Sequence, residues 1–208
     1  TSGLDVSVQA TVLALFREGR AKMTVLLWVI NFMNLLNLYF LSNWLPTIAK
    51  EAGLSTANAV LAGTALQVGG TIGTLVMGQL IDRSSFRRIL LPCFLVAAVA
   101  IALIGRPDVS LAFLFITIFI AGFCVVGGQP AVNALAASYY PTTLRSTGIG
   151  WSLGIGRIGS IIGPVLGGEL IRLNWPNSTI FLVVAIPAIV SAVMVFAMRG
   201  GPQTAAKG

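Results

Sequence analysis

The sequence predicts an all-α membrane protein with six transmembrane helices arranged as two three-helix repeats. Of its 208 residues, 56% are hydrophobic and only 9% are charged, whereas a soluble domain carries about 25% charged residues. The apolar residues form six long runs, each near the roughly 20 residues that a helix needs to cross a bilayer. A β-barrel would show alternating segments of about ten residues instead.

The six spans are predicted at residues 23–45, 58–81, 89–105, 110–135, 146–171 and 178–198. Before them, residues 1–22 are expected to form a cytoplasmic linker with an amphipathic surface helix. Apolar residues there recur at helical spacing from Val8 to Phe16, beside charged residues. After the spans, residues 199–208 are expected to form a cytoplasmic tail. The chain begins with Thr1, and we expect it to be part of a longer protein.

The basic residues outside the spans fall mainly on one side of such a bundle. Nine belong to the linker, the tail and the loops after the second and fourth spans, while three belong to the other loops. Because Lys and Arg accumulate on the cytoplasmic side, both termini are expected in the cytoplasm and the protein in the inner membrane. The net charge of +7 is then a property of these loops, and no nucleic-acid partner is expected.

Polar residues are distributed unevenly among the spans. The first, second, fourth and fifth spans carry amides, hydroxyls or an arginine, while the third and sixth carry almost nothing polar. Two polar spans are thus followed by an apolar one, and the order then repeats. This pattern predicts two three-helix repeats, each with a third helix that faces lipid.

Arg157 lies near the middle of the fifth span, too deep for its side chain to reach the surface easily. An arginine at a helix centre costs roughly 2.5–3.5 kcal/mol, so something must offset that cost. All six acidic residues lie in loops or near helix ends. The partner is therefore a bound anion, an acid from a missing portion, or backbone carbonyls and water. Because guanidinium matches carboxylate in bidentate geometry, we expect Arg157 to bind the carboxylate of an organic anion.

Further candidates for substrate binding are amides and aromatic residues of the polar spans. The amides are Asn31, Asn34, Gln67, Gln129 and Asn133, and the aromatic residues, which would stack on a ring, are Tyr39 and Trp151. Amides are costly to bury, so those of the first and fourth spans are expected to line a water-filled cavity, with hydrogen bonding between helices as the alternative. Gln67 shares a helix face with Thr64, Thr71 and Thr74, and we expect that stripe to bond neighbouring helices.

Glycines of the fifth span recur every four residues, at Gly159, Gly163 and Gly167. This spacing lets two helices approach closely, and Pro164 weakens the helix locally. Close packing is the expected role, and a bend beside a binding site is the alternative.

Several enzyme classes do not fit this sequence. Residues 154–159 match G-x-G-x-x-G but follow no strand, and residues 150–154 match G-x-S-x-G although the chain has no histidine to activate a serine. Cys93 and Cys124 lie in apolar runs and form neither a zinc site nor a disulfide scaffold. We therefore expect no enzyme, no cofactor and no metal.

Two motifs resemble those of the major facilitator superfamily. Residues 78–88, GQLIDRSSFRR, are similar to its cytoplasmic loop motif G-x-L-x-D-R-x-G-R-[RK], with Ser85 and Phe86 in place of a glycine and an arginine. Residues 159–168 resemble its Gly-Pro packing motif. Within the superfamily the chain resembles the aromatic acid:proton symporter family. The matching segments are 27–28, 39–40, 44–46, 140–150 and 156–164.

This resemblance implies that the spans are helices seven to twelve of a twelve-helix transporter. Its function would be proton-coupled transport of a small organic carboxylate, which in this family is aromatic. Its partners would be membrane lipid, the N-terminal half of the same transporter, the organic anion and protons. The proton-coupling acids would lie in the other half, so this chain alone is not expected to transport. Loop residues would form a cytoplasmic gate; they are Gly78, Asp82, Arg83, Arg87 and Arg145. The alternatives are an exporter of other small molecules and a stand-alone six-span protein that dimerises.

Overall fold

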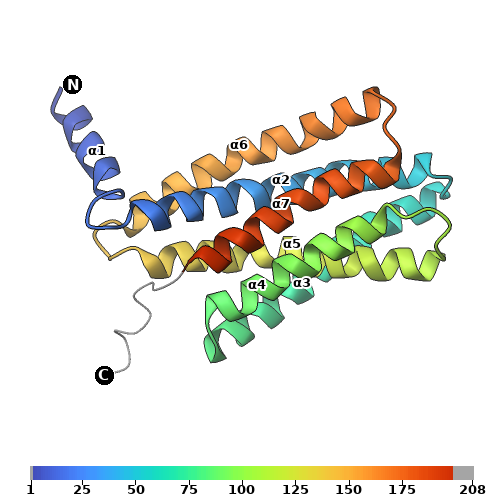
Figure 1. The fold of residues 1–208 in the computed structure, drawn as a ribbon, viewed down its shortest axis with the longest axis horizontal. Coiled ribbons are helices and arrows are strands. Elements are labelled where there is room, and N and C mark those ends of the chain that lie inside the picture. Colours follow the sequence, from blue (N-terminus) through green and yellow to red (C-terminus); the bar gives the residue numbers. More distant parts are fainter. Residues whose placement is uncertain (1, 199–208) are drawn as a thin grey trace.

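The computed structural model describes residues 2–198, which form seven α-helices (Figure 1). They are α1 (Ser2–Ala14), α2 (Ala21–Glu51), α3 (Thr56–Arg83), α4 (Phe86–Ile104), α5 (Leu111–Tyr139), α6 (Arg145–Arg172) and α7 (Asn177–Ala197). The last six are long and apolar enough to cross a membrane, which confirms the six predicted spans. The predicted tail, residues 199–208, lies outside the described residues.

One span is clearly longer than predicted. Helix α2 continues through Pro46 to Glu51, although the prediction ends it at residue 45. A proline removes one backbone hydrogen bond from a helix interior. Leu45 and Ile48, on either side of it, are buried in the core, and this packing holds the helical backbone across the proline.

The six spans pack as two equivalent repeats. Helix α3 packs most extensively against α5, α2 packs next most extensively against α6, and α4 packs against α7. When α2, α3 and α4 are exchanged for α5, α6 and α7 respectively, the α3–α5 contact becomes the α6–α2 contact. The α4–α7 contact becomes itself, as two equivalent repeats require. Because each repeat has three helices, the second starts on the opposite side of the membrane from the first, as in inverted-repeat transporters. The predicted repeat arrangement is confirmed.

The connections divide between two ends of the bundle (Figure 1). The linker end holds α1 and the α3–α4 and α5–α6 connections, while the distal end holds the α2–α3, α4–α5 and α6–α7 connections. Helices α4 and α7, the third helices of the two repeats, expose apolar side chains such as Leu95, Val99, Ile186 and Val193. Such faces suit lipid, in agreement with their predicted position.

Glycines bring the paired helices into backbone contact. A Cβ atom on Gly159 of α6 would lie well within 3.0 Å of the carbonyl oxygen of Phe32 on α2. A Cβ atom on Gly73 of α3 would do the same with Phe123 of α5. The packing role predicted for the α6 glycines is thus confirmed. Helix α3 has an equivalent series that includes Gly69 and was not predicted.

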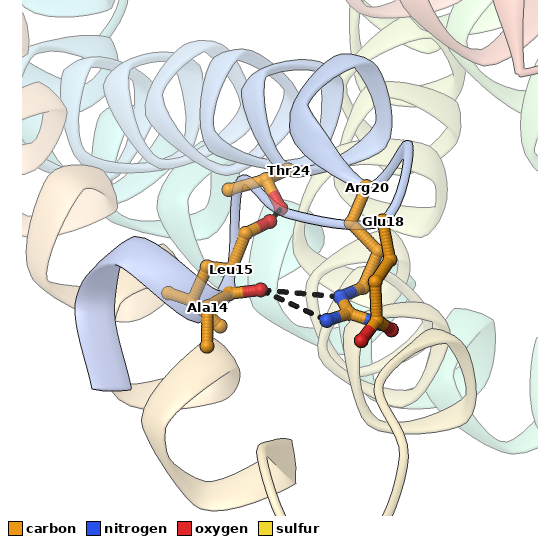
Figure 2. A network of polar contacts seen from close by, with 5 residues as sticks. All are labelled: Ala14, Leu15, Glu18, Arg20 and Thr24. Carbon is orange, nitrogen blue, oxygen red and sulfur yellow. Dashed lines mark hydrogen bonds and ion pairs between the residues drawn. The ribbon is translucent and has the colours of Figure 1, made fainter. Parts of the chain in front are cut away.

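Helix α1 is joined to α2 by a turn that Arg20 stabilises (Figure 2). Arg20 Nε and Nη2 donate to the carbonyl oxygen of Ala14 at 3.2 and 3.0 Å, and Arg20 Nη1 pairs with Glu18 at 2.6 Å. The carbonyl group of Ala14 is one that a helix end leaves without an intrahelical partner. The guanidinium therefore caps α1 and fixes the turn.

The same turn places Leu15 in the core of the bundle. Its side chain is fully buried among residues of α2, α4, α5 and α7. Tyr140 donates to the Thr24 hydroxyl at 2.9 Å, and Thr24 donates to the Leu15 carbonyl oxygen at 2.7 Å. Burial raises the pKa of the Tyr140 phenol, so this group keeps the proton that it donates.

The predicted amphipathic helix is wrong in its extent. The spacing of apolar residues predicts a helix that includes Phe16, but α1 ends at Ala14. Glu18 and Gly19 both adopt positive φ angles, of 56° and 76°, which a right-handed helix does not allow. The helical run of α1 therefore ends before α2 begins.

Candidate substrate-binding site

The candidate site lies on the faces of α3 and α6 that the bundle leaves open. These two helices are the least apolar of the six spans and also the least buried. Their open faces carry apolar side chains such as Ile72 and Ile161, with polar side chains such as Gln67 and Arg157 among them. Helix α2 packs against both of them and supplies the residues that their polar side chains contact.

Arg157 of α6 contacts Tyr39 of α2. Its Nη1 atom donates to the Tyr39 hydroxyl at 3.1 Å, and the arginine side chain is exposed. Among the side chains that the structure describes, residue 7 and residues 9–198, the ion pairs join Arg20 with Glu18 and Arg172 with Glu169. Within the described part of the chain, the Arg157 charge is therefore not neutralised by a carboxylate.

A second polar contact lies one turn along α2. Ser42 follows Tyr39 by three residues and so shares its helix face. Gln67 of α3 donates from Nε2 to the Ser42 hydroxyl at 3.3 Å, and both residues line an open groove between α2 and α3. Tyr39 and Ser42 thus form a polar strip that α6 contacts from one side and α3 from the other. Ser42 was missed as a site residue, and its spacing from Tyr39 was the available signal.

The threonines beside Gln67 do not bond neighbouring helices. The hydroxyls of Thr64, Thr71 and Thr74 donate to carbonyl oxygens four residues earlier in α3, at 3.0–3.1 Å. This bond within one helix satisfies a hydroxyl without any partner helix. The expected role of the stripe is therefore wrong for the threonines, and Gln67 alone of these four residues reaches another helix.

The other amides form a buried network that joins α2, α5 and α6. Asn34 donates to Gln129 Oε1 at 2.7 Å, and Gln129 Nε2 donates to Asn31 and Asn133 at 2.9 and 3.1 Å. Asn31 also donates to Ser152. Asn31 and Asn34 are 0% and 1% exposed, and Gln129 is 9% exposed. The expectation that these three line a water-filled cavity is wrong, because their polar groups bond one another; Asn133 lies half-buried at the edge of the network.

Trp151 offers a flat aromatic surface on the open face of α6, six residues before Arg157 and toward the linker end. Its ring stacks on Trp28 of α2, with the ring centroids 5.9 Å apart and the planes inclined by 22°. Trp151 is nevertheless 41% exposed and lines an open groove with Gly150 and Gly154. A Cβ atom on either glycine would meet nothing within 4 Å, so there is room for a planar group. Trp28 was missed as a supporting residue, because a position near a helix end suggested no partner.

The predicted gate residues lie at the linker end without forming a joined cluster. Asp82, Arg83 and Arg145 are exposed, and none takes part in an ion pair within residues 2–198. The guanidinium of Arg87 lies 5.0 Å from the ring centroid of Phe196 on α7. Gly78, in the last turns of α3 before the α3–α4 connection, has open space beside it. The gate stays a prediction.

Ser85, which replaces a glycine of the loop motif, caps α4. Its side chain accepts from the backbone N–H of Arg88 at 3.4 Å. A serine is among the residues preferred at this position. The turn between α3 and α4 therefore forms with serine where the motif has glycine.

Inverted three-helix repeats with a polar strip near mid-membrane depth are typical of secondary transporters. Residues 27–208 match the Major Facilitator Superfamily, and the chain belongs to this family. In the described residues, no group of three side chains suited to a metal ion accompanies the strip.

Several curated relatives are named for aromatic acids. The chain is 39% identical over 188 residues to the benzoate transport protein of Acinetobacter baylyi and 36% identical over 183 residues to the gallate transporter of Pseudomonas putida. It is 33% identical over 185 residues to the 3-(3-hydroxy-phenyl)propionate transporter of Escherichia coli. The matches cover 90%, 88% and 88% of this chain, but 40%, 41% and 45% of the relatives. The chain thus spans less than half the length of these relatives, and its predicted resemblance to aromatic acid transporters is confirmed.

Proposed function

We propose that this chain is the C-terminal half of a proton-coupled secondary transporter for a small aromatic carboxylate. One observation carries the proposal. Arg157 is exposed near the middle of a membrane-length helix, and its contact is the hydroxyl of Tyr39 rather than a carboxylate. A charge at this depth is costly, and a bound carboxylate offsets the cost through charge-assisted hydrogen bonds. The names of the relatives support an aromatic acid as that anion.

The proposed binding mode uses both parts of the open face. Arg157 takes the carboxylate, and the Tyr39 hydroxyl, which accepts from Arg157, donates its own hydrogen to the same group. Trp151, which Trp28 supports from behind, lies toward the linker end and would contact the ring as the acid passes along the open face. Gln67 and, at the network's edge, Asn133 bond ring substituents. Asn31, Asn34 and Gln129 then act indirectly, because their network fixes α2 and α6 at the spacing that the site needs.

The other half of the transporter is proposed to cover the open faces of α3 and α6 and to rock against them. The distribution of Lys and Arg favours a cytoplasmic linker end, in the inner membrane, with both termini on that side. Asp82, Arg83, Arg87 and Arg145 would form a gate there, next to Gly78. The acidic residues of this chain lie in loops or near helix ends, so proton-coupling acids are assigned to the other half.

The proposal is tested by uptake of labelled benzoate into cells that express the full-length protein. Arg157→Gln is expected to lower uptake by about tenfold to a hundredfold, since hydrogen bonds to a charged group contribute about 1.5–3 kcal/mol. Uptake by Arg157→Lys is expected to lie between that of the wild type and that of Arg157→Gln, because lysine keeps the charge but loses the bidentate geometry. Arg172→Gln is the control, a residue of the same helix that pairs with Glu169 near the helix end.

Three results would each contradict a part of this proposal. Wild-type uptake by Arg157→Gln, at equal amounts of protein in the membrane, would remove the role of Arg157. Uptake that an uncoupler leaves unchanged would remove proton coupling and keep the substrate class. Failure of the wild type to take up any of several aromatic acids would overturn the substrate class itself.

A further inference from the structure

A partly enclosed cavity of about 440 Å³ lies at the distal end of the bundle. We call it the distal cavity. It forms where the end of α2, the α4–α5 connection, the start of α5 and the start of α7 meet, so it shares no lining residue with the site around Arg157. Its floor is apolar; the floor residues are Leu45, Ile48, Ile104, Leu114, Ile118 and Phe181. Both the volume and the apolar lining are typical of small-molecule sites, which span about 300–1,000 Å³.

The internal repeat shows that the chain fills the equivalent position at the other end. Exchanging the repeats maps the distal cavity onto the linker end, where the ends of α5 and α7 meet the starts of α2 and α4. There the side chains of the same four helices form a continuous buried cluster. Leu15 and Tyr140 complete this cluster, with 0% and 1% exposure. One of two equivalent positions is therefore closed by the protein's own side chains, while the other stays open.

The rim of the distal cavity suits a carboxylate. Arg106 is exposed there and takes part in no ion pair within residues 2–198. Helix α7 starts at the rim with Asn177 and has no side-chain cap. The N–H group of Thr179 donates to Pro176, so the N–H groups of Asn177 and Ser178 and the positive end of the helix dipole are those that face an anion. Asp108, also on the rim, adds one negative charge.

We propose that the distal cavity is a second binding site, for a small carboxylic acid with an apolar ring. The ring packs on the apolar floor, and the carboxylate lies between Arg106 and the start of α7. The ligand class rests on the proposed function, but the site is independent of Arg157. Because the distal end is proposed to face outward, this site would bind the acid from outside the cell.

The test counts labelled benzoate bound per molecule of purified full-length protein by equilibrium dialysis. The wild type is expected to bind two equivalents, Arg157→Gln one, and Ala52→Trp one. Ala52 is an exposed residue that lines the cavity after the end of α2, so a large side chain there covers the opening without entering the core. Ala57→Trp is the matched control, because Ala57 is exposed at the same end of the bundle but does not line the cavity.

Two charge changes in the Arg157→Gln background test the orientation of the ligand and do not depend on Ala52→Trp folding. Arg106→Gln is expected to raise the Kd of the remaining site by about tenfold. Asp108→Asn is expected to lower it severalfold, and asparagine tolerates the positive φ of 58° at this position. A change of the same sign in both variants would overturn the proposed carboxylate position.

The stoichiometry separates this proposal from the proposed function. One equivalent in the wild type, lost in Arg157→Gln, would overturn the distal site and keep the transport site. One equivalent kept in Arg157→Gln and lost in Ala52→Trp would overturn the role of Arg157 and keep the distal site. Two equivalents in Ala52→Trp would also overturn the distal site.

Discussion

Gln129 shows how a single side chain ties three helices together. Its carbonyl oxygen accepts from Asn34, and its amide nitrogen donates both hydrogens, to Asn31 and to Asn133. Asn31 extends the network to Ser152 on α6. Each of these groups is costly to leave unpaired in a membrane-embedded core. The network therefore specifies how α2, α5 and α6 fit together, and in the proposed binding mode the ligand contacts the exposed strip instead.

Replacing Gln129 with leucine is expected to destabilise the protein. Asn31 Oδ1 and Asn133 Oδ1 lose the hydrogens that Gln129 donates, and Asn34 keeps only the Val125 carbonyl oxygen as its acceptor. Each buried polar group left unsatisfied costs about 1–3 kcal/mol. The expected result is a lower melting temperature of the purified full-length protein. Gln67→Leu is the control, because Gln67 is exposed and makes one long hydrogen bond. An equal shift in both variants would contradict a special role of the network.

The sequence identifies Arg157 as an unusual residue, but it does not predict how the amides pair, and the reason is physical. A charge inside an apolar run is unusual whatever surrounds it, so no contact needs to be known. Whether an amide faces water or another amide depends on tertiary packing. Asn31 and Ser152 are 121 positions apart, and Gln129 and Asn34 are 95 apart. Local spacing carries no information on such pairs.

Within helix α6 the glycines differ in what surrounds them. Gly159 and Gly163 lie against the backbone of α2, while Gly150 and Gly154 face open space. The first pair permits the close α2–α6 contact, and the second pair leaves room beside Trp151. The sequence predicts the packing role from the four-residue spacing, but the similar α3 series was hidden by the threonines among it.

Gly159→Ala and Gly154→Ala form a matched pair on this helix. The first is expected to lower the melting temperature by several degrees, since the added methyl group would meet the Phe32 carbonyl and the two backbones would have to separate. The second is expected to leave the melting temperature unchanged or higher, because alanine favours the helix and meets no atom. Thermal unfolding of the full-length variants is the measurement. The reverse order would contradict the packing described here.

At the scale of the whole molecule, the order of polar and apolar spans already indicates the inverted repeat. That order sets which helices face lipid and which face the open side, and the structure agrees. The difference between the two ends of the bundle was not predictable in this way. It depends on Leu15, a residue outside the spans, and on a turn that positive φ angles produce.

The orientation of the bundle is tested with cysteines at the two ends of α3. Ser84→Cys lies at the linker end and Ala57→Cys at the distal end, and both positions are exposed. A membrane-impermeant maleimide is expected to label Ala57→Cys in intact cells and Ser84→Cys only after the membrane is opened. The native Cys93 and Cys124 are buried, so the wild type is the blank. Labelling of Ser84→Cys in intact cells would reverse the proposed topology.

The position of Leu15 bears on how such a protein is divided for experiments. A separately expressed bundle that starts at Ala21, the first residue of α2, would lack a fully buried side chain and the carbonyl oxygen that Thr24 bonds. It would expose an apolar hole at the linker end and would be prone to aggregate for reasons unrelated to transport. For complementation between two separately expressed halves, the chain should therefore be divided upstream of Ala14. The cap from Arg20 and the buried Leu15 then stay with the bundle.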